Sequence, residues 1–281
     1  MKLLITVLLT ILFLLGDVDS SRILALFPYN AKSHFFMYEK LLKALAARGH
    51  EVVVLGHFPQ KKPIENYKDI DVRGTLPEII NSFTLEMIDN ESCMTFPYTI
   101  ILEHIDMCKS VLNHTAVKEL IHSQEKFDLI ISEIFGSDCL LGFVHKFKVP
   151  FIGVISSFAF PWANSRLGLP DNPAYIQNYF LPYTDRMSFK QRLINTVHSV
   201  YLKWMYHQYS DIVTYEIAKQ FFGKDLPPLW EIAKNTSLVL SNSYFSVNQP
   251  RPTVPGFIEV GGLHVTEAQK LPKMSSIKMF K

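Results

Sequence analysis

Residues Arg22–Gly56, RILALFPYNAKSHFFMYEKLLKALAARGHEVVVLG, decide the fold of this chain. The apolar run Ile23–Phe27 predicts a strand that is buried on both faces of a parallel sheet, and Pro28 ends it. Val52–Leu55 predicts a second strand of the same kind, after a helix that ends at Gly49. A strand, helix and strand in about 30 residues form one βαβ unit, which is typical of an α/β fold.

The helix of this unit is expected to begin near Phe35, where the apolar spacing becomes helical. Asn30 and Ser33, in the loop before it, are candidates for its N-cap. The helix should bury one stripe of side chains, formed by Met37, Leu41, Ala44 and Leu45.

The loop between the first strand and this helix carries one histidine, His34. It falls at the C-terminal edge of the predicted sheet, where ligands bind in open α/β folds. The positive end of the helix dipole disfavours imidazolium, so a neutral ring there can accept a proton. His34 is therefore either a general base or a capping or merely exposed loop residue. The loop lacks G-x-G-x-x-G, so glycine gives no support for a dinucleotide site.

Two more apolar runs, Phe127–Ser132 and Phe151–Ile155, predict further buried strands of a Rossmann-like parallel sheet with helices on both faces. Glu133 ends the first of these strands and so shares the sheet edge of His34. A carboxylate at that place must reach solvent, a cap or a partner charge, because unpaired burial is costly. Asp138 precedes a short apolar helix and is expected to cap it.

The connecting segments carry further expectations. Asp71–Arg73 could form a short strand, and Ile100–Ser123 is predicted to be one helix. Pro161–Pro182, with four prolines among aromatic residues, is interpreted as an ordered surface excursion near the mouth of the sheet. The helix over Ile100–Ser123 should bury a stripe formed by Ile101, Ile105, Cys108 and Leu112.

Phe189–Tyr209 predicts another helix, which contains a run of aromatic residues. Such a run could rest on a membrane face or pack in the core. Because positive charges around it are sparse, packing in the core is the preferred interpretation. The aromatic residues concerned are Tyr201, Trp204, Tyr206 and Tyr209.

The charge balance and the N-terminus restrict the class of protein. With 28 basic and 26 acidic residues and no basic block, the chain is not expected to bind nucleic acid. Residues 1–20 have the pattern of a secretory signal peptide, and their apolar run is too short to span a bilayer. No later stretch is long enough, so no membrane span is expected. Sequons at Asn90, Asn113 and Asn235 are candidate glycosylation sites in a secretory lumen.

A metal site is not expected. Cys93, Cys108 and Cys139 are too few for a disulfide framework, and their odd number leaves at least one thiol unpaired. His104 and Cys108 have the i, i+4 spacing that could hold zinc on a helix, but no second pair of ligands accompanies them.

Several segments together resemble the UDP-glycosyltransferase family of animals, and its insect members most closely. The resemblance implies a two-domain GT-B fold, of which residues 21–264 would form the N-terminal, acceptor-binding domain and residues 265–281 the start of the interdomain linker. The family's donor-binding elements are not present in the sequence, so a truncated form is expected. The segments that carry the resemblance are Pro28–His34, LLKALAARGHEVVVL, FDLIISEIFGSDCLLGF, MSFKQRLIN, LVLSNS and PGFIEVGGLH.

The resemblance also implies a chemistry. Family members transfer a sugar with inversion from a UDP-sugar co-substrate to a small lipophilic acceptor, without a metal or other cofactor. His34 matches the histidine that takes the acceptor's proton. The acid that orients this histidine is usually aspartate, and Glu133 stands at the matching position, with Asp138 as the reserve candidate. Relatives of this kind work in the lumen of the endoplasmic reticulum and are membrane-anchored.

The residues and the resemblance together leave two classes of function. The first is a UDP-glycosyltransferase. The second is a non-catalytic module that holds a lipophile or associates with full-length relatives and regulates them. A nicotinamide-dependent enzyme is disfavoured because the glycine fingerprint is missing.

Overall fold

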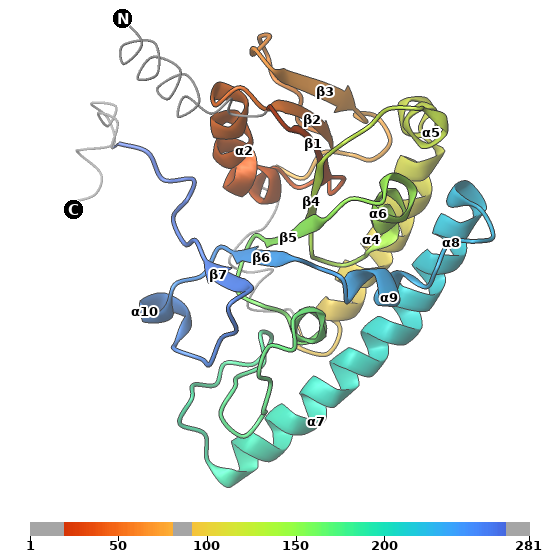
Figure 1. Cartoon of the computed structure of the whole chain (residues 1–281). Helices are drawn as coiled ribbons and strands as arrows, with labels where there is room; N and C mark the ends of the chain where they lie inside the picture. Colours follow the sequence, from red (N-terminus) through yellow and green to blue (C-terminus); the bar gives the residue numbers. More distant parts are fainter. Residues whose placement is uncertain (1–19, 81–91, 268–281) are drawn as a thin grey trace, which may run out of the picture.

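The computed structural model describes residues 20–80 and 92–267 (Figure 1). Its centre is one sheet in which all neighbouring strands run parallel, in the order β3-β2-β1-β4-β5-β6-β7. This is the Rossmann-like parallel sheet that the sequence predicts. Its strands are β1 (Arg22–Phe27), β2 (Glu51–Gly56), β3 (Tyr67–Asp71), β4 (Leu129–Glu133), β5 (Phe151–Ile155), β6 (Leu238–Ser241) and β7 (Phe257–Glu259).

Helices cover both faces of this sheet (Figure 1). Helix α2 packs on one face, and α4, α5, α6 and α8 pack on the other. The helical elements are α2 (Lys32–Ala47), α4 (Phe96–Asn113), α5 (Thr115–His122), η1 (Cys139–Leu141), α6 (Gly142–Phe147), η2 (Pro161–Arg166), α7 (Phe189–Tyr206), the π-helical turn η3 (His207–Asp211), α8 (Ile212–Phe222), α9 (Leu229–Ala233) and α10 (Phe245–Asn248).

Strand β1 shows why a continuous apolar run is needed at the centre of the sheet. Ile23, Ala25 and Phe27 face the core under α2, whereas Leu24 and Leu26 face the core under α4 and α5. All five side chains are buried. A polar residue at any of them would lose water on one face without gaining a partner.

Helix α2 buries the stripe that the sequence predicts only in part, since Met37, Leu41 and Leu45 pack against the core without being fully buried. Its buried residues are Phe35, Tyr38, Leu42 and Ala46, and Ala44 is exposed. The stripe is displaced because Tyr38 can be buried: its hydroxyl donates to the backbone oxygens of Ile155 and Leu240, the latter at 3.0 Å. Gly49 ends the helix region with a φ of +93°, as expected of a residue after a helix C-terminus.

Three other segments differ from expectation. The edge strand is Tyr67–Asp71 and not Asp71–Arg73. The predicted helix over Ile100–Ser123 is two helices, because His114 adopts an extended conformation between α4 and α5. The Pro161–Pro182 excursion is partly core. It buries Trp162, Ala163, Leu169 and Ile176.

The aromatic run near the end of α7 is also divided. Tyr206 is buried, as the core interpretation requires, but Trp204 and Tyr209 are exposed. That interpretation is therefore wrong for these two residues. The stripe expected on α4 is confirmed, because Ile101, Ile105, Cys108 and Leu112 are all buried.

Some expectations fall outside the described residues. These are Asn90, nearly all of the predicted signal peptide, and most of the predicted linker at 265–281. The domain boundary at residue 264 stays a prediction. Within residues 20–80 and 92–267, no helix combines the length and the apolar character needed to cross a bilayer.

Candidate active site

His34 lies in the first turn of α2 and not in the loop before it. Ala31 occupies the N-cap position and no side-chain hydrogen bond caps the helix, so the predicted caps Asn30 and Ser33 are wrong. Asn30 instead donates from Nδ2 to the backbone oxygen of Pro77 at 2.5 Å. The backbone N–H of Ile79 donates to the backbone oxygen of Asn30, and the backbone oxygen of Ile79 accepts from the N–H of Lys32. These two hydrogen bonds fix the segment that leads into His34.

Glu133 is the last residue of β4, which pairs directly with β1. Its Oε1 lies 2.6 Å from His34 Nδ1, and its side chain is only 4% exposed. The two side chains that the sequence places on one sheet edge are therefore in contact. The extra methylene of glutamate, compared with the aspartate that the sequence resemblance implies at this position, does not prevent this pairing.

Ser156 is a second neighbour of His34, which the sequence does not identify as a partner. Its Oγ lies 3.0 Å from the same Nδ1 atom, and it directly follows β5. Because β5 pairs with β4, the chain brings Ser156 beside Glu133 at the sheet edge. Its place just after a strand is the signal that could have assigned it.

These contacts define the proton positions on the imidazole. A carboxylate can only accept, so Nδ1 must carry the hydrogen that it donates to Glu133. In the neutral ring Nε2 is then the bare nitrogen that can accept a proton from another group. The arrangement has the geometry of a base oriented by an acid.

Two aromatic rings hold the His34 imidazole in place. The ring centroid of Tyr29 lies 4.8 Å from that of His34, edge to face, and the ring of Phe135 lies 4.4 Å away. Tyr29 is itself fixed, since its hydroxyl donates to Glu103 at 3.1 Å. Burial raises the pKa of Tyr29 far above its usual value, so the phenol stays neutral.

A second histidine, His104, lies behind these rings. It stacks on Tyr29 at 4.5 Å, and its Nδ1 is 2.8 Å from the backbone oxygen of Ile100. Burial lowers the pKa of His104 to about 4, so it is neutral at physiological pH. It fits only because residue 136 is glycine: a Cβ at Gly136 would lie 2.4 Å from its ring. His104 therefore supports the aromatic packing, and α4 gives no local sequence signal for this role.

Asp138 does not do what the sequence predicts. It makes no side-chain cap to the helix that follows it. Its carboxylate instead forms a buried ion pair with Arg166 of η2. The expectation of a cap is therefore wrong, because a buried guanidinium satisfies a buried carboxylate better than one backbone N–H does. As the reserve partner for His34, Asp138 is already engaged, whereas Glu133 contacts the ring.

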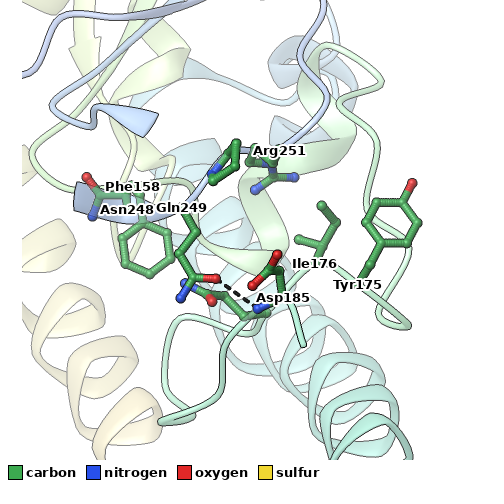
Figure 2. Close-up of a pocket in the computed structure, with 9 residues that line it drawn as sticks. Phe158, Tyr175, Ile176, Asp185, Asn248, Gln249 and Arg251 are labelled. Carbon is green, nitrogen blue, oxygen red and sulfur yellow. Dashed lines mark hydrogen bonds between the residues drawn. The ribbon is translucent and has the colours of Figure 1, made fainter. Parts of the chain in front are cut away.

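A small pocket lies apart from His34 and Glu133 (Figure 2). It is formed between the residues after β5 and the residues after α10. Gln249 accepts a hydrogen bond from Asp185 N at 2.8 Å, drawn in the figure, and Arg251 donates to the backbone oxygen of Pro170 at 2.6 Å. These bonds tie the two segments together.

No group of three or more His, Cys, Asp or Glu side chains that could hold a metal ion occurs in the part of the chain that the structure describes. His104, considered as a zinc ligand with Cys108, uses its Nδ1 for the bond to Ile100.

Comparison with known proteins gives relatives over most of the chain. UDP-glucosyltransferase 2 of Dactylopius coccus is 39% identical over 263 residues, which are 92% of this chain and 50% of that protein. UDP-glycosyltransferase UGT5 of the same insect is 36% identical and covers 94% of this chain and 51% of its own length. The crystal structure of Arabidopsis thaliana UGT89C1 complexed with quercetin matches with a TM-score of 0.46 and 13% identity, over 93% of this chain and 55% of that one.

The chain thus spans about half the length of the curated relatives it matches. A family model, described as UDP-glucoronosyl and UDP-glucosyl transferase, matches residues 23–279. That match covers the parallel sheet and the described helices from Ile23 onward, and it includes His34 and Glu133. The chain belongs to the UDP-glucoronosyl and UDP-glucosyl transferase family.

Proposed function

We propose that this chain is the acceptor-binding half of an inverting UDP-glycosyltransferase, which moves a hexosyl or glucuronosyl group from a UDP-sugar to a small lipophilic acceptor. The observation that carries the proposal is the 2.6 Å contact between His34 Nδ1 and Glu133 Oε1 in a member of this family. The names of two relatives specify UDP-glucosyl or UDP-glycosyl transfer.

The proposed reaction uses Nε2 of His34 as the base. It takes the proton of an acceptor hydroxyl while that oxygen attacks the anomeric carbon of the sugar. The bond from this carbon to the UDP oxygen breaks, UDP leaves with the electron pair, and the configuration inverts. Glu133 keeps the ring in the required tautomer and stabilises the imidazolium. A positioned base of this kind raises the rate by about 10²-fold to 10⁴-fold.

The test joins this chain to the half of the Dactylopius coccus UDP-glucosyltransferase 2 that the chain does not cover. We expect this chimera to transfer glucose from UDP-glucose to small phenols or alcohols. The 281-residue chain by itself should bind UDP with a Kd of about 1 mM or weaker, roughly −4 kcal/mol. A folded chimera that binds the lipophile but never turns over would instead favour a non-catalytic module that associates with full-length relatives.

We also place the protein in the lumen of the endoplasmic reticulum, on the strength of the N-terminal pattern and the sequons. Asn113 and Asn235 are exposed, as are Thr115 and Ser237, the hydroxyl residues that complete the two sequons. Expression in insect cells followed by glycosidase treatment and peptide mapping tests this. Occupied Asn113 or Asn235 is expected. An unmodified protein that stays in the cytosol would refute the assignment.

A further inference from the structure

Helix α7 exposes a continuous row of apolar side chains. They recur at i, i+4, i+8, i+11 and i+15 and so fall within about 80° of the helix circumference. Figure 1 shows α7 along one border of the molecule. We call this row the outer face of α7; its residues and exposed fractions are Phe189 (75%), Leu193 (54%), Val197 (61%), Val200 (62%) and Trp204 (54%).

The outer face is not the poorly packed side of an ordinary core helix. The opposite side of α7 is already packed, with Asn195, Leu202 and Met205 among its buried residues. The helix is therefore packed on one side and exposes an apolar row on the other, although only the packed side is needed for the fold. A row of this length is larger than the scattered apolar residues of a normal surface and indicates an interaction.

Amphipathic aromatic residues extend the outer face at its C-terminal end. Trp204 contacts Tyr209 of η3 with ring centroids 6.2 Å apart, and Tyr209 contacts Tyr98 of α4 at 5.4 Å. All three are exposed. Trp and Tyr with an apolar body and a polar tip are the residues that prefer the boundary between lipid and water.

The charges of α7 select the partner. Its charged residues, Lys190, Arg192 and Lys203, are all basic, and at 100° per residue they flank the outer face on both sides. Lys203 is paired with Asp171, and among the described residues neither Lys190 nor Arg192 has a carboxylate within 4 Å. A second copy of the chain would bring like charges together. Anionic lipid headgroups would neutralise them.

We propose that the outer face of α7 lies on a lipid bilayer, parallel to its plane, with the apolar row among the upper acyl chains and the flanking basic residues at the headgroups. This goes beyond the proposed function and does not depend on it. The domain would then be held at a membrane by its own surface, without a span in the described residues.

The experiment uses protein secreted from insect cells, whose N-terminus is read by mass spectrometry so that the apolar segment at residues 3–15 can be shown to be absent. Flotation with phosphatidylcholine vesicles, with and without phosphatidylserine, measures binding. Val197→Glu with Val200→Glu should weaken binding by about tenfold or more. The matched control, Val247→Glu with Val265→Glu, adds the same two charges at even more exposed valines outside α7 and should bind as the wild type does. Lys190→Gln should reduce the gain that phosphatidylserine gives.

Fluorescence provides a second measurement that needs no charged variant. Brominated lipids should quench Trp204, and Trp204→Phe should remove that quenching, because Trp162 is buried and Trp230 is half-buried. Equal vesicle binding by the α7 variant and the control variant at Val247 and Val265 would overturn the proposal. So would vesicle-independent dimerisation that the α7 variant abolishes, since it would assign the outer face to a second copy.

Discussion

Glu133 and His34 are 99 residues apart in the sequence, and Oε1 of the first lies 2.6 Å from Nδ1 of the second. The parallel pairing of β1 with β4 produces this contact, because it brings the ends of both strands to one edge of the sheet. A second carboxylate nearby, Asp138, is bound to Arg166. The two acids therefore have different partners: Glu133 contacts His34, and Asp138 is paired with Arg166.

The buried ion pair should be essential for stability. Replacing Arg166 by Met leaves the buried carboxylate of Asp138 without its cation. The free energy of unfolding at neutral pH should fall by about 3–5 kcal/mol, as for other broken buried pairs. Urea denaturation measures this.

Arg73→Met is the control for that variant, because it breaks an exposed pair with Asp71. Exposed pairs contribute little, so the denaturation midpoint should hardly move. Similar losses in Arg166→Met and Arg73→Met would show that burial of the Arg166 pair has no special effect.

The close approach of Gly136 to His104 gives a steric prediction. Gly136→Ala would put a Cβ 2.4 Å from the imidazole and should cost about 1–3 kcal/mol through overpacking. At Gly256 the nearest atoms to a new Cβ are 3.4 Å away, on the side chain of Leu167, so Gly256→Ala should be tolerated. Thermal unfolding of the two variants compares them. Equal melting temperatures would show that Gly136 and His104 are not in close contact.

His104 should make the protein sensitive to acid. Burial lowers the pKa of His104 from 6.5, its value in the unfolded chain, to about 4 in the folded chain. The unfolded state therefore binds the proton more readily. The stabilisation is complete above pH 6.5 and is lost as the pH falls toward 4, by roughly 3 kcal/mol in all. His104→Asn should flatten this part of the curve of unfolding free energy against pH. An unchanged slope in the variant would exclude His104 as the cause.

The sequence predicts the centre of this fold well, because buried parallel strands must be continuous apolar runs, as Ile23–Phe27 and Phe151–Ile155 are. It also predicts that His34 and Glu133 share a sheet edge, since both follow such runs. The rule that parallel strands end at one edge is enough for that inference.

Other parts of the site could not be predicted from local pattern. The partner of Asp138 is Arg166, which lies in a segment without regular spacing, so the local pattern around Asp138 indicates only a capping role. His104 reaches the aromatic packing from α4, where its spacing to Cys108 gives no indication of that role. The fully buried stripe of α2 is displaced from the predicted one because a tyrosine, Tyr38, is buried through backbone partners that only the folded sheet supplies.

Rate measurements on the chimera decide whether Glu133 or Asp138 is the acid that orients His34, and Glu133 is the one in contact with the ring. His34→Ala should lower kcat by about 10² to 10⁴. Glu133→Gln should lower kcat steeply with little loss of stability, because it removes the charge that stabilises imidazolium. Asp138→Asn keeps Asp211 near Arg166, and its folded fraction should retain nearly normal kcat. An inactive Asp138→Asn beside a nearly normal Glu133→Gln would instead make Asp138 the acid that serves His34.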